Sequence, residues 1–193
     1  MRIIRYPHPT LRHESKPLRR VDAELHEIVR EMFELMYKAE GIGLAANQVD
    51  LPYRMFVLNL TGDRAAAEKE YVFLNPVLRS PKGSAESEEG CLSLPGLYGQ
   101  VRRPERVVLN AYDLTGRELT LDLDGLFARA VQHEVDHLDG VLFTDRLSPT
   151  ALADARPELE RFEDQFLTER ERGEIPDDRA IAARLAELEK LRT

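Results

Sequence analysis

Residues 125–140 read GLFARAVQHEVDHLDG, and this stretch decides the centre of the predicted fold. Leu126 and Val131 are among the apolar residues that recur near one helical face. Gly140 stands where a glycine commonly ends a helix. The spacing therefore predicts an amphipathic helix over residues 125–138, and that helix carries the most distinctive residues of the chain.

His133 and His137 are separated by four positions on this predicted helix, and Glu134 directly follows the first histidine. Residues at i and i+4 lie on the same helical face, so both imidazoles can reach one metal ion. Glu134 can then point at a water molecule beside that ion, which is the placement of a general base. The plainer alternative is a solvated helix face with two surface histidines. The combination favours a metal-dependent hydrolase.

A catalytic metal site needs a third protein ligand and an open position for water. The three-histidine motif of one group of metalloproteases is excluded, because Phe143 stands where its third histidine would be. Cys91, the only cysteine, is one candidate, and Gly90 before it lets the backbone approach closely. The spacing equally allows a glutamate from the C-terminal region: Glu158, Glu160 or Glu163.

One further helical region precedes this helix, several strands lie between the two, and a helical tail follows. Asp22 fits the N-cap of a helix over residues 22–39. Strands are predicted at residues 55–60, 71–74, 106–112 and 118–123. Asn75-Pro76 is expected to end the second strand, and the acidic segment 84–90 leads into Cys91. This order predicts an α+β fold with a mainly antiparallel sheet.

The composition narrows the class of protein. The chain has 193 residues, which suits one domain with an appendage, and its single cysteine excludes an internal disulfide. The formal net charge of -8 argues against a general nucleic-acid-binding protein, which normally has a basic face. No signal-peptide pattern opens the chain, and no apolar run reaches the length of a membrane span. We therefore expect a cytoplasmic protein without membrane association.

Three separated motifs carry a family resemblance: GIGLAANQ at residues 41–48, EGCLS at 89–93 and QHEVDHLDG at 132–140. Together they resemble the motifs of peptide deformylases, in the version common among Gram-negative-type bacteria. The resemblance covers roughly residues 1–170. It implies an α+β catalytic domain over that range, with mainly antiparallel sheets around a central metal-binding helix, and a helical C-terminal extension over residues 171–193.

The resemblance implies an activity and a metal. The expected reaction removes the formyl group from the N-terminal formyl-methionine of newly synthesised polypeptides and releases formate. The implied metal ligands are Cys91, His133 and His137. The family commonly uses iron(II), while a cysteine and two histidines also suit zinc(II), nickel(II) or cobalt(II). Glu134 is the implied general base.

The resemblance also implies oxyanion donors and substrate contacts. The donors are the side-chain amide of Gln48 and the backbone N–H of Leu92; without its motif, Gln48 is read more simply as a polar residue closing a loop. Four residues are expected to contact the substrate: Ile42, Gly43, Gly90 and Val131. The simpler alternatives are that Ile42 and Val131 belong to the core and that Gly43 helps to end the preceding helix.

Charged residues around the motifs receive supporting roles. Glu89 and Arg103 are predicted to form an ion pair behind Cys91. Asp136 and Asp139 are read as solvent-facing residues without a catalytic role.

The tail, residues 151–193, carries eight Lys and Arg against twelve Asp and Glu, a net charge of -4. An acidic tail suits RNA phosphates poorly, so ribosome docking through it has little support. The expected partners are formyl-methionyl nascent peptides, with no specific nucleic acid. An apolar stripe of Ile181, Leu185 and Leu188 is expected to pack on the domain or on another subunit.

Two rival functions remain beside the deformylase interpretation. One is a metallopeptidase that uses the same helix with a glutamate from the tail as third ligand. The other is a binding protein with a structural metal, which is disfavoured because structural sites are normally closed by four ligands and need no base such as Glu134.

Overall fold

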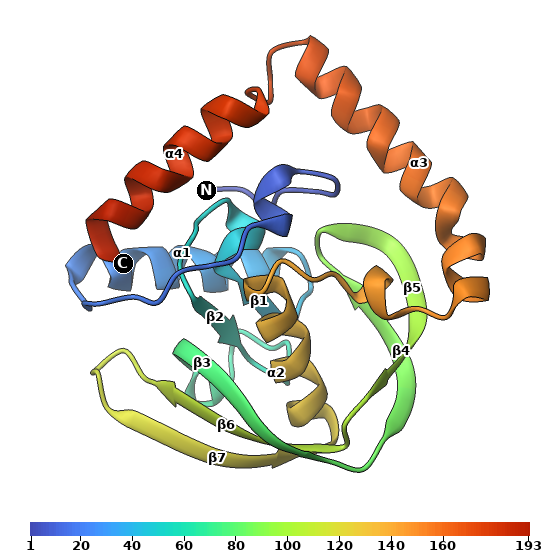
Figure 1. The fold of residues 1–193 in the computed structure, drawn as a ribbon. Coiled ribbons are helices and arrows are strands. Elements are labelled where there is room, and N and C mark those ends of the chain that lie inside the picture. Colours follow the sequence, from blue (N-terminus) through green and yellow to red (C-terminus); the bar gives the residue numbers. More distant parts are fainter.

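The computed structural model describes all residues from Met1 to Thr193. A central helix lies between a large sheet and a long hairpin, and two C-terminal helices fold back over the N-terminal segment (Figure 1). The helices are α1 (Ala23–Lys38), α2 (Gly125–Leu138), α3 (Pro149–Glu171) and α4 (Asp178–Arg192). Short 3-10 turns are η1 (Pro9–Arg12), η2 (Ala46–Val49), η3 (Ala67–Lys69) and η4 (Phe143–Arg146).

Helices α1 and α2 begin or end at residues that favour helix termini. The side chain of Asp22 accepts a hydrogen bond from the backbone N–H of Leu25 and caps α1. The central helix α2 has the predicted bounds, and Gly140 follows it with a φ of 72°, a conformation that glycine adopts without steric cost. Both predicted helices are thus confirmed within one residue at each end.

Five strands form the large sheet, in the order β1-β2-β3-β6-β7. They are β1 (Gly43–Ala45), β2 (Met55–Leu58), β3 (Tyr71–Lys82), β6 (Arg106–Tyr112) and β7 (Glu118–Asp124). All neighbours pair antiparallel, which confirms the predicted α+β class with a mainly antiparallel sheet. The expected end of the strand at Asn75-Pro76 is wrong: the strand shifts register there, with Asn75 at a φ of 51°, and continues to Lys82.

The second sheet is a hairpin of β4 (Ala85–Cys91) and β5 (Leu94–Arg103), and it was not among the predicted strands. Glu86 and Glu88 are exposed, so β4 lacks the apolar alternation that marks a half-buried strand. The hairpin delivers Cys91 at its turn. The strand that carries Cys91, a predicted metal ligand, therefore cannot be predicted from hydrophobic periodicity.

One face of α2 packs on the large sheet. Val131 and Leu138 of the helix share a core cluster with Phe56, Phe73 and Leu109 of the strands. Because residues four apart lie on one face, this packing fixes the rotation of the helix and turns the two histidines toward the hairpin. The core thereby sets the direction of the two histidine side chains that are predicted to bind a metal.

The C-terminal helices pack on the same molecule. Ile181 and Leu185 of α4 are buried with Phe166 of α3 and Ile175 of the connecting loop. Leu188 is partly buried against the core cluster that contains α1. The apolar stripe therefore packs on the domain, one of the two predicted alternatives. None of the helices combines the length and the apolar character that crossing a membrane requires.

Candidate metal centre and active site

Three potential ligands converge where the β4–β5 turn meets α2. One ligand atom from each of Cys91, His133 and His137 lies within 4.8 Å of the other two. The Sγ atom of Cys91 is 3.2 Å from Nε2 of His137. Glu158, Glu160 and Glu163, the alternative third ligands, are on α3 and outside this group; Glu163 instead accepts a hydrogen bond from Tyr6.

The donor set fits a divalent cation. Metal–sulfur and metal–nitrogen bonds of about 2.3 and 2.0 Å at tetrahedral angles place neighbouring ligands about 3.5 Å apart, close to the separation of Cys91 and His137. Burial lowers the pKa of His137 well below its ordinary value, which favours the neutral imidazole that binds a metal. Oε2 of Glu134 beside them is buried without a hydrogen-bond partner. Such an orphaned carboxylate oxygen is expected where a further ligand completes the site.

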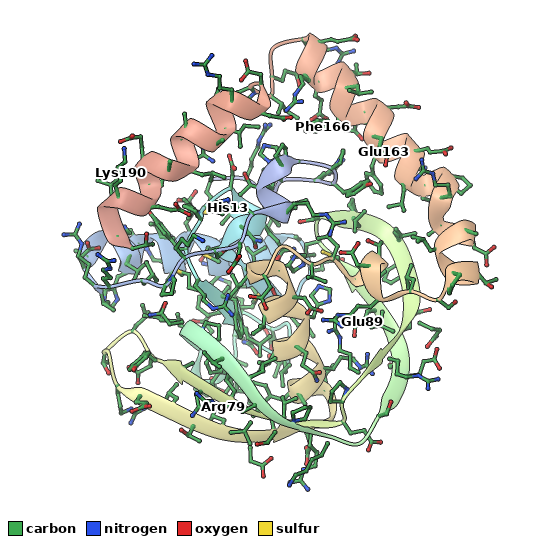
Figure 2. All side chains as sticks on the ribbon, viewed as in Figure 1. His13, Arg79, Glu89, Glu163, Phe166 and Lys190 are labelled. Atoms are coloured by element: carbon green, nitrogen blue, oxygen red, sulfur yellow. The ribbon has the colours of Figure 1, made fainter.

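His133 is oriented by Glu89, which lies beside α2 (Figure 2). Oε2 of Glu89 is 3.0 Å from Nδ1 of His133, which leaves Nε2 for a metal. Arg103 donates two hydrogen bonds to the same carboxylate, of 2.6 and 2.9 Å, and Arg129 donates one of 2.6 Å. Burial alone would raise the pKa of Glu89, but the bonds from His133 and Arg103 hold it well below its usual range. The predicted Glu89–Arg103 ion pair is present, with two further partners.

Asp136 differs from its prediction as a solvent-facing residue. Its side chain is buried and accepts hydrogen bonds from Arg103, at 2.7 Å, and from Arg146. These two arginines supply the compensation that a buried carboxylate requires. Asp136 thus extends the network that holds Glu89 behind the ligands. Asp139 is exposed as predicted and pairs with Arg54 at 2.6 Å.

Gln48 is buried beside Cys91. Its Oε1 accepts a hydrogen bond of 2.8 Å from the backbone N–H of Ala45, which fixes which way the amide points. Its Nε2 then faces the site, 3.2 Å from Oγ of Ser93 and 3.4 Å from Sγ of Cys91. The Gln48 side chain therefore does more than close a loop: its Nε2 lies beside Cys91 at the candidate metal centre.

Glu134 reaches across from α2 to β1. A Cβ atom added to Gly43 would collide with Oε1 of Glu134, so a larger residue at this position would displace the carboxylate. Burial raises the pKa of Glu134 to about 7, because the charged form is poorly solvated there. Glu134 is therefore held against the strand without a donor of its own.

A cavity of about 660 Å³ opens over these residues. Ile42, Gly43, Gly90 and Leu92 line it, together with Leu126 and Ala130 of α2. Val131 does not line it, since its side chain is fully buried in the core beneath. The cavity brings together every site residue expected from the sequence except Val131 and His137; His137 is fully buried and meets Cys91 beneath the cavity. Arg129 also lines the cavity and is not among the predicted site residues, although it lies one helical turn before His133.

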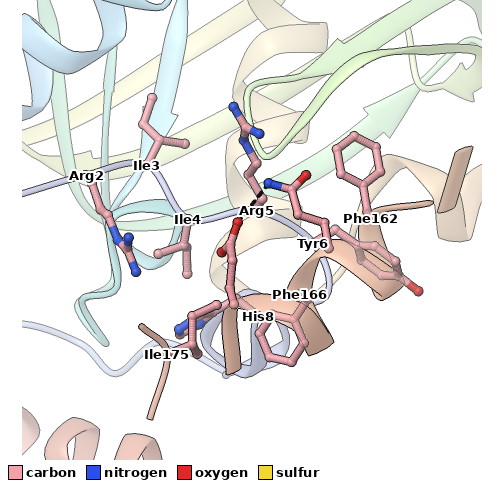
Figure 3. Close-up of a pocket in the computed structure, with 11 residues that line it drawn as sticks. Arg2, Ile3, Ile4, Arg5, Tyr6, His8, Phe162, Phe166 and Ile175 are labelled. Atoms are coloured by element: carbon pink, nitrogen blue, oxygen red, sulfur yellow. Dashed lines mark hydrogen bonds between the residues drawn. The ribbon is translucent and has the colours of Figure 1, made fainter. Parts of the chain in front are cut away.

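A second, smaller cavity of about 240 Å³ lies between the N-terminal segment and α3 (Figure 3). His8, Phe166 and Ile175 gather there, while the guanidinium of Arg5 points away from them. Arg5 also lines the larger cavity. The smaller cavity contains no cluster of metal-ligating side chains, so the chemistry belongs to the larger one.

Known proteins that are similar in sequence to this chain are peptide deformylases. The family described as polypeptide deformylase matches residues 1–152. The chain is 52% identical over 191 residues to a peptide deformylase of Rhodopirellula baltica, covering 99% of this chain and 94% of that protein. It is 47% identical over 148 residues to a peptide deformylase of Neisseria gonorrhoeae, covering 77% and 87% of the two chains.

Solved structures of the same family superpose closely. A peptide deformylase from Plasmodium falciparum matches with a TM-score of 0.85 at 36% identity, covering 86% of this chain and 98% of that one. Peptide deformylase 1B of Arabidopsis thaliana, in complex with an inhibitor, matches with a TM-score of 0.84 at 41% identity, covering 92% and 97%. The family predicted from the three motifs is confirmed: the chain belongs to the peptide deformylases.

Proposed function

We propose that this chain removes the N-terminal formyl group from the formyl-methionine of newly synthesised polypeptides and releases formate. The observation that carries the proposal is the convergence of Cys91, His133 and His137 beside Glu134, whose Oε2 is buried and unpartnered. Three ligands leave a fourth position open, as a catalytic site requires and a structural site does not.

Cys91, His133 and His137 would hold one divalent cation. When bound, the cation supplies a Lewis acid that acidifies water and polarises the formyl carbonyl. Iron(II) is the first candidate by family resemblance, and zinc(II), nickel(II) and cobalt(II) suit the same ligands. Glu89 keeps His133 in the tautomer and orientation that a ligand needs, through the 3.0 Å contact to Nδ1.

Glu134 acts as the general base and then as the general acid. Its free Oε2 accepts a proton from the water that attacks the formyl carbon, and it returns the proton to the nitrogen that leaves as the new amino terminus. A positioned group of this kind contributes about 10²–10⁴ in rate. The buried setting and the contact with Gly43 keep the carboxylate aimed at the reacting atoms.

Gln48 and Leu92 stabilise the negative charge that develops on the formyl oxygen. The amide of Gln48 donates from Nε2, which already faces Cys91 at 3.4 Å, and the backbone N–H of Leu92 donates from the β4–β5 turn. Removing one such donor typically costs about 2.7–4 kcal/mol in the barrier.

The cavity walls select the substrate. Ile42, Leu126 and Ala130 offer an apolar surface for the methionine side chain. Gly43 and Gly90 lie in β1 and β4, whose backbones can pair with an extended peptide as an added strand. Val131 supports this wall from the core rather than touching the substrate.

Residues 1–170 act as the catalytic domain and residues 171–193 as a helical extension, in a protein that works in the cytoplasm on nascent peptides. The net charge of -4 over residues 151–193 gives ribosome docking by the tail weak support, because it opposes binding to RNA phosphates.

The test is formate release from a formyl-methionyl tripeptide by protein purified without oxygen and loaded with each candidate metal. We expect release, and we expect Cys91→Ala to lose both the metal and the activity. Retention of the metal by Cys91→Ala would support a metallopeptidase with a different third ligand. Absence of formate with every metal would overturn the proposal.

A further inference from the structure

The C-terminal helix α4 is tied to the first third of the chain by polar contacts at several points. Glu189 lies 2.8 Å from Nε2 of His13, and the carbonyl of Arg192 accepts a 2.8 Å hydrogen bond from the N–H of Arg19. Figure 1 shows α4 running alongside the N-terminal segment, and Figure 2 labels His13 below the helix. The helix has a fixed position over the turns that follow β1.

Near the N-terminal half of α4, Arg184 contacts one residue twice. Its Nη2 lies 2.5 Å from Oδ2 of Asp50 and donates a 2.7 Å hydrogen bond to the backbone carbonyl of the same residue. Thr10 donates a 2.5 Å hydrogen bond to the other carboxylate oxygen of Asp50. Asp50 is thus held from two sides by segments that are remote in sequence.

Asp50 has an unusual backbone conformation. It ends η2 with a φ of 65°, in the left-handed region that residues with a Cβ rarely adopt. Its N–H donates to the carbonyl of Asn47, and the N–H of Leu51 donates to that of Ala46, so this conformation closes the turn. Aspartate adopts this region more readily than most residues with a Cβ, and here Arg184 and Thr10 hold its carboxylate in place.

The turn closed by Asp50 carries Gln48. The backbone path through η2 sets where the Gln48 side chain starts, and its Nε2 reaches to within 3.4 Å of Cys91. A shift of this turn would move the amide relative to the ligands while leaving Cys91, His133 and His137 on their own elements. Arg184 is thus connected to the Gln48 amide beside Cys91 through a single residue, Asp50, which closes the turn.

We propose that Arg184 is a positioning residue: through Asp50 it fixes the η2 turn and so aims the amide of Gln48 at the reacting carbonyl. The idea rests on the proposed function, in which Gln48 is an oxyanion donor. Arg184 lies beyond residues 1–152, which match the polypeptide deformylase family as a whole, although the relative from Rhodopirellula baltica also matches over 191 residues.

The test compares Arg184→Gln with Arg179→Gln, a matched control on the same helix whose arginine is exposed and has no ion pair. Formate release should show kcat lowered about two- to fivefold in Arg184→Gln, the range that a partly exposed ion pair can supply, with KM and metal content unchanged. Arg184→Lys should recover most of the loss. In an Asp50→Gly background, where a φ of 65° costs nothing and the carboxylate is gone, Arg184→Gln should have a smaller effect, because only the contact with the backbone carbonyl remains.

Hydrogen exchange gives a readout that does not depend on turnover. The amides of residues 46–51 should exchange faster in Arg184→Gln than in Arg179→Gln, while those of α2 stay the same. Equal kcat and equal exchange in the two variants would overturn the inference. So would a loss that affects KM or metal content as much as kcat. If the unaltered protein released no formate, the proposed function would fail, and the exchange data alone would decide whether Arg184 holds the turn.

Discussion

Replacing Glu89 with glutamine is expected to weaken both the fold and the metal centre. The carboxylate accepts four hydrogen bonds: two from Arg103, one from Arg129 and one from His133. Glutamine at this position keeps only one acceptor oxygen. Its NH₂ group would face N–H donors of the arginines or of His133 and could accept no hydrogen bond from them. Removing one partner of a buried ion pair costs about 3–5 kcal/mol. Arg103 keeps Asp136 as a second partner, so we expect the lower end, about 3 kcal/mol.

The loss at the metal centre is a separate quantity. Nδ1 of His133 loses a charged acceptor, and substitutions at such supporting residues typically lower metal affinity about 10–100-fold. Urea unfolding of the metal-free protein measures the first effect, and competition with a chelator measures the second. Glu86→Gln is the matched control, because Glu86 lies on the same strand and pairs with Arg102 at 3.3 Å in an exposed position. If Glu89→Gln matched this control in both assays, the supporting role would be refuted.

Two further substitutions test other parts of the structure. Gly43→Ala should displace Glu134 and lower kcat at least tenfold, whereas Gly41→Ala, whose added methyl meets the end of a flexible leucine side chain, should have a smaller effect; formate release measures both. Equal losses would show that the crowding of Glu134 is unimportant. Arg192→Gln should lower the free energy of unfolding by about 1–3 kcal/mol in urea, because this buried guanidinium bonds Asp22. An unchanged unfolding midpoint would mean that the end of α4 is not stabilised by this contact.

The sequence predicted the central helix and the position of its two histidines well, because both depend on local spacing. The bounds of α2 match the prediction, and its period of about 3.6 residues alone brings His133 and His137 to one face. Only the family resemblance identifies Cys91 as the third metal ligand, because spacing along the chain also allows Glu158, Glu160 or Glu163. The position of Cys91 depends on the hairpin of β4 and β5, and the charged residues of β4 do not show the apolar alternation that predicts a strand.

Ion pairs between residues far apart in the sequence could not be predicted from local sequence patterns either. The sequence around Asp136 contains no pattern that predicts an ion-pair partner, so a solvent-facing side chain is expected. In the structure, Arg103 of β5 and Arg146 of η4 donate hydrogen bonds to it in the interior. The same limit applies to Asp50, whose contact with Arg184 joins residues far apart in the chain. Such pairs follow from the packing of elements, which periodicity does not fix.

The central claim is that Glu134 moves the proton at a metal held by other residues. Metal content and formate release measured on the same anaerobic preparations of the unaltered protein and of Glu134→Gln test it most directly. We predict about one metal per chain in both, with turnover at least 10²-fold lower in the variant. A Glu134→Gln protein that kept its metal and released formate at the unaltered rate would contradict the account.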